Sequence, residues 1–281
     1  MRVLFLSILS FFIISNSSFS QEKKEKENNN SVYTGLKFRS IGPALMSGRI
    51  SDIIIHPKNE NIWYVTAGSG GVWKTENSGT TWNPIFDSQK SYSIGCITMD
   101  PQNNNVLWVG TGENVGGRHV GYGDGIYKSE NGGQTWSIKG LNNSEHISKI
   151  IIHPNNSDVL WVASQGPLWS KGGDRGVYKT VDGGKTWQRK LGDDKWIGAT
   201  DLLIDSRNPD VLYAATWQRH RTVAGYMGGG PGTAIYKSTD GGENWQKLTK
   251  GLPKSNMGKI GLAMSYQNND IIYAAIELDR R

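Results

Sequence analysis

The stretch Thr180-Val-Asp-Gly-Gly-Lys-Thr-Trp187 decides the fold, because three close copies of it occur elsewhere in the chain. The copies are Thr75-Glu-Asn-Ser-Gly-Thr-Thr-Trp82, Ser129-Glu-Asn-Gly-Gly-Gln-Thr-Trp136 and Ser238-Thr-Asp-Gly-Gly-Glu-Asn-Trp245. Their tryptophans recur at intervals of about 50 to 60 residues, a period that fits one four-stranded blade of a β-propeller. We call these four segments the box turns.

Each interval between box turns has the same internal order. An apolar strand such as Ile150-Ile-Ile-His-Pro154 is followed by a polar turn and then by a second strand, Val159-Leu-Trp-Val162. A loop of variable length leads to the third strand, Val177-Tyr-Lys179, and the box turn leads to a fourth strand that begins at its tryptophan. Short apolar strands bounded by turn residues favour an all-β fold.

The sequence therefore predicts an all-β protein, a β-propeller with four complete four-stranded blades and a partial fifth. A fifth interval begins at Lys259-Ile-Gly-Leu262 and reaches Ile271-Ile-Tyr-Ala274, with no third strand or box turn before Arg281. Propellers normally close by pairing their first and last blades, so we expect this one not to be closed and the chain to be a fragment of a longer protein. The predicted blades are about 44–90, 91–141, 146–192, 198–250 and 257–281, the last one incomplete, within a propeller region of 34–281.

The start of the chain predicts export. Met1 and Arg2 form a short basic segment, residues 3–14 are almost all apolar, and Ser18 and Ser20 are small residues suited to a cleavage site. We interpret residues 1–20 as a signal peptide, residues 21–33 as a polar linker and residues 35–41 as a strand. The apolar run is too short for a membrane span, so we expect a secreted, periplasmic or cell-surface protein with no span after cleavage.

Composition narrows the classes of function. The 281 residues carry a formal net charge of +6 without a block of Lys or Arg, so no nucleic-acid partner is predicted. The five histidines are widely separated, which gives no metal-ligand spacing, and no phosphate loop is present. We expect no cofactor. Cys96, the single cysteine, lies in a strand-like run and is expected to be a buried, inert thiol.

The box turn has a physical explanation. An Asp or Asn side chain at its third position can accept hydrogen bonds from main-chain N–H groups of the turn, the fifth-position glycine suits a positive φ, and the tryptophan buries a large apolar area between sheets. We assign this structural role to Asn77, Trp82, Asn131, Trp136, Asp182, Trp187, Asp240 and Trp245. Because two turns carry Asn in place of Asp, a catalytic or calcium-binding role is disfavoured.

These four segments fit the Ser/Thr-x-Asp/Asn-x-Gly-x-Thr-Trp pattern, and the chain resembles the BNR, or Asp-box, β-propellers over about residues 40 to 281. The runs Phe38-Arg-Ser-Ile-Gly-Pro43, Gly68-Ser-Gly-Gly-Val-Trp-Lys74 and Gly112-Glu-Asn-Val-Gly-Gly-Arg-His119 are more specific. They resemble large secreted bacterial proteins with a sortilin N-terminal (Vps10-like) domain, which are loosely labelled glycosyl hydrolases. Asp boxes mark an architecture and do not specify a reaction.

The resemblance also implies where a catalytic residue would stand. In the xyloglucanase-like proteins an acid precedes the Gly-Gly of the first blade, and here Gly68 occupies the matching place. Sialidases use an arginine in a Phe/Tyr-Arg-Ile-Pro stretch, which the run Phe38-Arg39-Ser40-Ile41 imitates in part. These departures disfavour catalysis by either route.

In a propeller the loops between second and third strands share one face with the blade-to-blade connections, and the box turns lie on the opposite face. We call the first of these the loop face. Its long Gly-rich loops carry charges and aromatic rings, a composition typical of binding sites. The predicted ligand-binding residues are Arg118, His119, Tyr122, Arg175, Trp217, Arg219 and His220. The alternative is that the arginines brace the loops.

Three functions remain open. The first is an exported, non-catalytic propeller that binds a protein, peptide or glycan ligand through the loop face. The second is a glycoside hydrolase, which needs two carboxylates beside the sugar bond; Glu113 and Asp174 are the candidate pair, with Asp124 in reserve. The third is an assembly helper of another exported enzyme.

Overall fold

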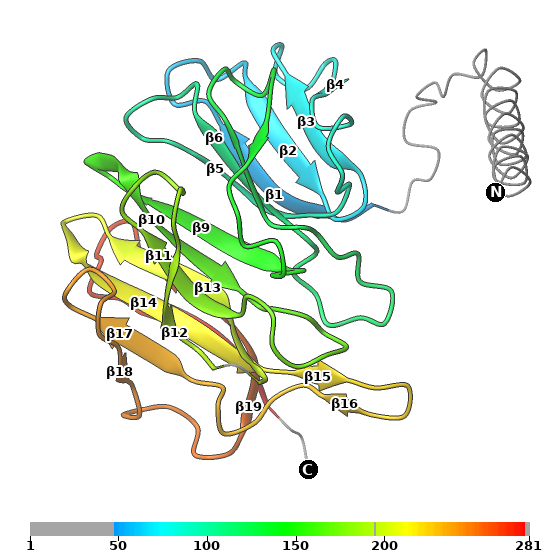
Figure 1. Cartoon of the computed structure of the whole chain (residues 1–281). Helices are drawn as coiled ribbons and strands as arrows, with labels where there is room; N and C mark the ends of the chain where they lie inside the picture. The colour runs from blue at the N-terminus through cyan, green and yellow to red at the C-terminus, as the bar shows by residue number, and fades with distance from the viewer. Residues whose placement is uncertain (1–47, 194, 279–281) are drawn as a thin grey trace, which may run out of the picture. The chain divides into compact units, whose positions relative to one another are not determined.

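The computed structural model describes residues 48–193 and 195–278, and within these residues the chain forms twenty strands and no helix (Figure 1). The predicted signal peptide, linker and strand at residues 35–41 lie outside the described residues. The strands are β1 (Ile50–Ile55), β2 (Trp63–Ala67), β3 (Gly71–Thr75), β4 (Asn83–Pro84), β5 (Ile94–Met99), β6 (Leu107–Thr111), β7 (Ile126–Ser129), β8 (Ser137–Ile138), β9 (Ile147–His153), β10 (Asn156–Ser164), β11 (Gly176–Thr180), β12 (Gln188–Leu191), β13 (Ile197–Asp205), β14 (Asn208–Gln218), β15 (His220–Arg221), β16 (Tyr226–Met227), β17 (Ile235–Ser238), β18 (Gln246–Lys247), β19 (Met257–Met264) and β20 (Ile272–Leu278).

Eighteen of the strands form four antiparallel sheets of four strands each, followed by a sheet of two. The orders are β1-β2-β3-β4, β5-β6-β7-β8, β9-β10-β11-β12, β13-β14-β17-β18 and β19-β20. Each sheet is one blade, and no strand of the described residues pairs the first sheet with the last. The prediction of an all-β propeller with four complete blades, a partial fifth and no closure is therefore confirmed. No helix in the described part of the chain could cross a membrane.

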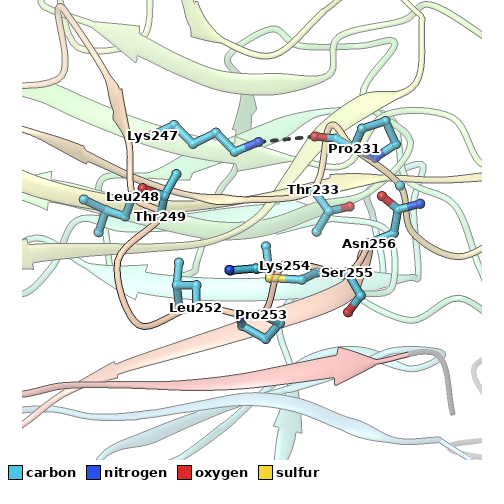
Figure 2. A pocket seen from close by; sticks show the side chains of 12 residues that line it. Pro231, Thr233, Lys247, Leu248, Thr249, Leu252, Pro253, Lys254, Ser255 and Asn256 are labelled. Atoms are coloured by element: carbon cyan, nitrogen blue, oxygen red, sulfur yellow. Dashed lines mark hydrogen bonds between the residues drawn. The ribbon is translucent and has the colours of Figure 1, made fainter.

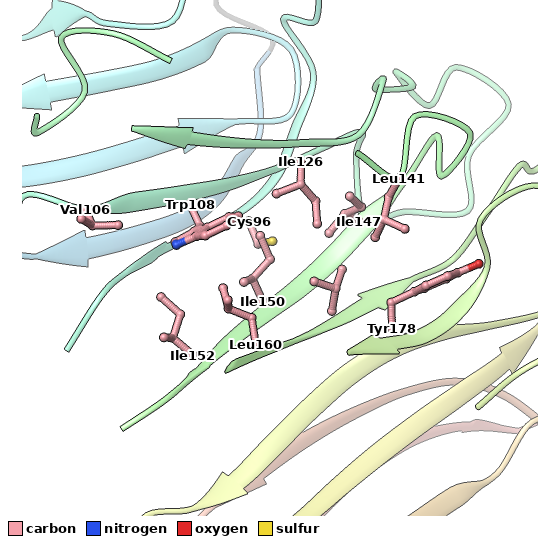
Figure 3. Packing of buried hydrophobic residues seen from close by; sticks show 11 residues of the cluster. Cys96, Val106, Trp108, Ile126, Leu141, Ile147, Ile150, Ile152, Leu160 and Tyr178 are labelled. Atoms are coloured by element: carbon pink, nitrogen blue, oxygen red, sulfur yellow. The ribbon is translucent and has the colours of Figure 1, made fainter. Parts of the chain in front are cut away.

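The hydrophobic core lies between neighbouring blades. The largest cluster joins the second and third blades, where Trp108 and Ile126 face Ile150 and Leu160 (Figure 3). Trp108 and Leu160 are completely buried. Three further clusters fill the other interfaces in the same manner. Because each blade covers the apolar face of the next, burial of apolar surface is what orders the blades side by side.

Hydrogen bonds between first strands of neighbouring blades add to this packing. Asp201 Oδ2 accepts a bond of 2.8 Å from the main-chain N–H of Leu262, and Thr200 Oγ1 donates a bond of 2.8 Å to the carbonyl of Ile260. Asp201 directly follows a β-bulge, which points its side chain toward the next blade. Equivalent bonds join Asp52 to Ile97, Thr98 to Ile150 and Ser148 to Ala199.

A lysine and an aromatic ring face each other across the second and third strands of every complete blade. In the third blade Lys179 is paired in register with Trp161, and its Nζ lies 5.6 Å from the ring centroid. The cation is held over the electron-rich face of the ring, an arrangement that contributes about 0.5–1 kcal/mol at exposed sites. The other pairs are Lys74 with Tyr64, Lys128 with Trp108 and Lys237 with Tyr213.

The box turn at residues 180–187 shows how the repeat joins the third and fourth strands of each blade. Asp182 Oδ1 accepts bonds from the N–H groups of Lys185 (3.0 Å) and Thr186 (2.9 Å), while Gly184 has φ = 81°. Trp187 Nε1 donates a bond of 2.7 Å to the carbonyl of Lys139, which belongs to the preceding blade. The turn thereby fixes the hairpin and directs its tryptophan onto a neighbour.

The fourth blade departs from the sequence prediction, which placed only a loop of variable length between the second and third strands. Strand β14 continues to Gln218, and β15 and β16 form an additional hairpin. The hairpin is closed at its tip because the N–H of Thr222 bonds to the carbonyl of Gly225 at 2.8 Å. Arg221 and Tyr226 are cross-strand partners, with the guanidinium 4.1 Å from the ring centroid.

Candidate functional site

The strand directions place the loops between second and third strands, together with the blade-to-blade connections, at the same end of every blade. Four aromatic side chains of these segments are exposed on the loop face. Their exposed fractions are 66% for Tyr92, 73% for Tyr122, 45% for Trp169 and 43% for Tyr226. Exposed aromatic rings on neighbouring loops are suited to stacking against flat, partly apolar ligands.

The loop between β6 and β7, residues 112–125, is closed at its base by a buried carboxylate. Glu113 is 2% exposed, forms an ion pair with Arg49, and accepts a bond of 2.9 Å from the N–H of Gly121. Arg49 Nη1 also lies 3.4 Å from Nε2 of His119. The carboxylate of Glu113, near the start of the loop, therefore binds Gly121 near the end of the loop. The Arg49 guanidinium balances its charge.

The Glu113 carboxylate also fills the space beside Gly68. A Cβ atom placed on Gly68 would lie 2.3 Å from Glu113 Oε1, so residue 68 can have no side chain without displacing this carboxylate. A carboxylate thus stands next to residue 68, although it comes from the neighbouring blade.

Three cations hold the first part of the same loop. Each one donates to a different carbonyl of three successive residues: Lys259 Nζ to Asn114 O at 2.5 Å, Arg219 Nη1 to Val115 O at 3.3 Å, and Arg221 Nη2 to Gly116 O at 3.0 Å. We call this arrangement the carbonyl clamp. It fixes a loop of the second blade to strands of the fourth and fifth blades.

Three of the predicted ligand-binding residues are buried. Arg175 and Arg219 are both 0% exposed and Trp217 is 2% exposed. Arg175 Nη2 donates to the carbonyls of Pro167 and Ser170 at 2.9 and 3.0 Å. These contacts support the bracing role that the sequence left open for the arginines.

The remaining predicted ligand-binding residues lie closer to the surface. Arg118, His119 and Tyr122 are exposed, and Arg118 Nη2 donates a bond of 3.2 Å to the carbonyl of Val223 at the tip of the β15–β16 hairpin. His220 is partly exposed, and its ring centroid lies 4.2 Å from that of Trp196. The accessible part of the predicted set therefore comes mainly from one loop, residues 112–125.

The other two candidate carboxylates serve local structure. Asp174 Oδ2 accepts a bond of 3.0 Å from the N–H of Asn143, and the Asp174 N–H bonds back to the Asn143 carbonyl at 3.0 Å. Asp124 Oδ2 accepts a bond of 2.8 Å from the hydroxyl of Tyr127. Burial raises the pKa of Tyr127, and the bond to Asp124 raises it further.

Glu145 is a carboxylate that the sequence reasoning did not select. Its φ is 53°, one of three positive values among the described non-glycine residues. Its carbonyl accepts a bond of 2.7 Å from the N–H of Gly123, and its carboxyl group interacts electrostatically with the main-chain N–H of Leu168. Tyr122 and Trp169 are the chain neighbours of those two donors, so Glu145 joins two loops that each present an aromatic ring.

The environment of Glu145 is typical of functional sites. Its side chain is 36% exposed, and partial burial raises the pKa of its carboxyl. Backbone strain and perturbed carboxyl pKa values are each enriched at sites of binding or catalysis. The connection from β8 to β9 carries no repeat signal at this position, which is why the sequence did not point to it.

Two hollows lie beside the fourth and fifth blades. One of about 360 Å³ is enclosed by the connection from β18 to β19, with Thr233, Leu252 and Lys254 among its lining residues (Figure 2). Across it Lys247 Nζ donates a bond of 3.4 Å to the carbonyl of Pro231. The second, of about 560 Å³, lies between Tyr226 and Glu277. Within residues 48–193 and 195–278, no cluster of three His, Cys, Asp or Glu side chains could hold a metal ion.

The blades, the hydrogen bonds between them and the loop face define a β-propeller protein. Among solved structures, the fold is similar to an ancestral GH74 enzyme, with a TM-score of 0.58 at 19% identity over 82% of this chain and 31% of that chain. It is also similar to the GH74 enzyme of Niastella koreensis, with a TM-score of 0.52 at 23% identity, covering 69% and 28% of the two chains.

The family model Sortilin-Vps10, described as "Sortilin, neurotensin receptor 3", matches residues 124–280. The chain belongs to this family. The family model spans more than half of the chain, from the β6–β7 loop to the fifth blade.

Two curated relatives are xyloglucanases. The oligoxyloglucan-reducing end-specific xyloglucanase of Emericella nidulans is 23% identical over 230 residues, which is 74% of this chain and 25% of the relative. The xyloglucanase of Hypocrea jecorina is 26% identical over 240 residues, which is 77% of this chain and 27% of the relative. The chain spans about a quarter of the length of these relatives.

Proposed function

We propose that this protein is an exported glycan-acting propeller of the glycoside-hydrolase type, which binds a neutral glucan chain along its loop face. The observation that carries the proposal is the position of Glu145 between the loops of Tyr122 and Trp169. Aromatic faces stack on sugar rings, and a carboxylate between them can accept bonds from sugar hydroxyls. The similarity to xyloglucanases supports a glycan over a protein or peptide as the ligand.

The burial of two of the predicted arginines supports a neutral ligand. Arg175 and Arg219, which could otherwise pair with the carboxylate of an acidic sugar, are completely buried. Glu145, in contrast, presents a carboxylate at the partly open part of the site. We therefore propose that the ligand is a β-glucan such as xyloglucan and not a sialoside.

Binding is tested by calorimetric titration of the purified chain with xyloglucan oligosaccharides. We expect Tyr122→Ala with Trp169→Ala, and separately Glu145→Gln, to weaken binding about tenfold or more, since a bond to a charged group contributes about 1.5–3 kcal/mol. The matched control is Tyr266→Ala, which removes a fully exposed ring from the β19–β20 turn at the opposite face. Absence of binding by the wild type, or equal binding by all variants, contradicts the proposal.

A second, catalytic function is favoured by one observation. The Glu113 carboxylate fills the space beside Gly68, the position that the resemblance assigns to an acid. Glu113 forms an ion pair with Arg49, and Glu145 has a raised pKa, as suits the general acid of a pair of carboxylates.

This hydrolytic function is tested by release of reducing ends from xyloglucan. We expect Glu145→Gln or Glu113→Gln to lower turnover about 100-fold or more. The Tyr266→Ala variant serves again as the control. A wild-type chain that binds the glycan without cleaving it would support binding and contradict hydrolysis.

A further inference from the structure

Among the first three blades, each box-turn tryptophan that follows a blade binds to the end of that blade. Trp136 Nε1 donates a bond of 2.8 Å to the carbonyl of Ile85, and Trp187 Nε1 donates one of 2.7 Å to the carbonyl of Lys139. Ile85 and Lys139 each directly follow the fourth strand of their blade. The indole of Trp187 also lies against Gly140, where an added Cβ would be 3.4 Å from the ring. One carbonyl and one glycine of the preceding blade thus form the contact for the indole.

The end of the fourth blade carries the same two features. Leu248 directly follows β18, and its N–H bonds to the third strand at 2.8 Å, as that of Lys139 does at 2.7 Å. Gly251 corresponds to Gly140, because their φ values are 77° and 93° and each is followed by leucine. An added Cβ at Gly251 would meet no atom within 4 Å, and among the described residues no tryptophan donates to the Leu248 carbonyl.

The hollow of about 360 Å³ lies at this place, with Leu248 and Leu252 among its lining residues (Figure 2). A cavity of roughly 150 Å³ with an apolar lining already holds a benzene ring, so this hollow has room for an indole. Leu248, Leu252 and Met257 also belong to the hydrophobic cluster between the fourth and fifth blades. The hollow is therefore continuous with an existing interface between blades.

The outer edge of β20 lies in the blade that adjoins the hollow. β20 pairs with β19 alone, whereas the second strand of every complete blade also pairs with a third strand. The run Ile271-Ile-Tyr-Ala274 aligns with Val211-Leu-Tyr-Ala214, so Tyr273 corresponds to the ring that each complete blade pairs with a lysine. Tyr273 is 62% exposed, and no lysine of the described residues lies over its ring. Exposed sheet edges bind added strands through main-chain hydrogen bonds.

We propose that the hollow and the edge of β20 together bind a β-hairpin of the box-turn type, supplied by a partner polypeptide. The first strand of the hairpin extends the β19–β20 sheet and places its lysine over Tyr273. Its tryptophan enters the hollow and donates to the Leu248 carbonyl. One hairpin can make both contacts, because β11 and β12 pair Lys179 with Gln188, the chain neighbour of Trp187.

The occupant is a partner and not a second copy, because all four box-turn hairpins of this chain are already paired within their own blades. Main-chain pairing supplies affinity, and the lysine and the indole supply specificity for this class of hairpin. The proposal is independent of the proposed glycan-acting function.

A synthetic peptide of residues 176–191, which is the hairpin of the third blade, tests the proposal on the full chain. Calorimetric titration measures its affinity, and hydrogen exchange locates its site. We expect one peptide to bind per chain and to slow amide exchange in β20. The Trp187→Ala peptide should bind about tenfold or more weakly, because buried aromatic anchors carry most of the affinity of such interfaces. The Lys185→Ala peptide, changed at an exposed position of the box turn, should bind as the original does.

A double-mutant cycle tests the contact at Tyr273. Tyr273→Ala in the chain and Lys179→Ala in the peptide should each weaken binding about two- to fivefold, and together they should weaken it little further. Tyr266→Ala, at a fully exposed ring of the β19–β20 turn, is the matched control. Absence of binding, or equal binding of the Trp187→Ala peptide, overturns the proposal. Protection of β20 by self-association of the chain without peptide would assign the edge to a second copy and overturn it as well.

Discussion

His146 is 1% exposed, and its Nδ1 lies 3.0 Å from the main-chain oxygen of Glu113. Burial lowers the pKa of this imidazole to about 3, and the positive charge of Arg219 acts in the same direction. The ring is therefore neutral in the folded protein at any pH near neutrality, while in the unfolded chain its pKa is about 6.5.

A pH dependence of stability follows from this difference. Between about pH 6.5 and pH 3 the unfolded chain binds a proton at His146 that the folded chain does not, so the free energy of unfolding falls as the pH is lowered, by about 1.4 kcal/mol per pH unit. The contribution is fully present above pH 6.5. We expect His146→Gln to lack this slope when urea unfolding is measured from pH 7 to pH 4. Identical slopes for the two proteins would contradict a buried neutral imidazole.

The sequence identified residue types at the loop face better than it identified their environments. It selected Arg175 and Arg219 as ligand contacts because they lie in Gly-rich loops, yet both are buried. Nothing in a local pattern reveals that a loop folds over its own arginine. Glu145 was missed for the same reason, since its bond to Gly123 and its interaction with Leu168 involve two other loops of the chain.

At the scale of elements, the box turn combines a hydrogen-bonded cap with a large apolar contact. Asp182 has a lowered pKa because the hydroxyl and N–H of Thr186, among other donors, bond to its charged form. Trp187 packs against the cluster between the second and third blades. The tryptophan thus acts between blades, whereas the aspartate acts within one turn.

Substitution of the tryptophan and of the aspartate should therefore lower the free energy of unfolding by different amounts. Trp187→Ala should lower the free energy of unfolding by about 3–5 kcal/mol, because it leaves a cavity at an interface between sheets. Asp182→Ala should lower it by clearly less, because water can replace the aspartate at the exposed turn. Urea unfolding of both variants checks this order, and an equal or reversed order would refute the assignment.

The elements themselves were largely predictable, because periodic spacing of apolar strands and turns follows from local chemistry. The additional hairpin of β15 and β16 was not, since its residues 219–227 begin with a polar run of four and do not alternate between polar and apolar. Its strands are held together by the pair Arg221 and Tyr226 and by the turn at Thr222, interactions without a counterpart among the described residues of the other blades.

At the scale of the whole molecule, two sheets present apolar side chains to solvent. On β1, Ile50, Ile53 and Ile55 are 62%, 52% and 50% exposed, and on β20 Tyr273 is 62% exposed. In the interior blades the corresponding faces are covered by a neighbour. Contiguous exposed apolar side chains on a sheet favour association with other apolar surfaces.

We therefore expect the chain to self-associate in a concentration-dependent manner. Replacing both Ile53 and Ile55 by lysine should reduce this association, because charged residues oppose contact between exposed strands. Sedimentation velocity at several concentrations measures the effect. A matched double variant at two exposed polar positions of the box-turn face, Thr80→Lys with Gln134→Lys, should associate as the wild type does. A monodisperse wild-type monomer at all concentrations would exclude this behaviour.

The carbonyl clamp has a consequence for the order in which the protein is made. Its bond from Lys259 to the carbonyl of Asn114 spans 145 positions of the chain. At a synthesis rate of about 5–20 residues per second, the ribosome adds Lys259 roughly 7–30 s after Asn114. The second blade can form its sheet during that interval, but the clamp on its long loop lacks its Lys259 bond until then. The carbonyl clamp is accordingly complete only when the fifth blade emerges from the ribosome.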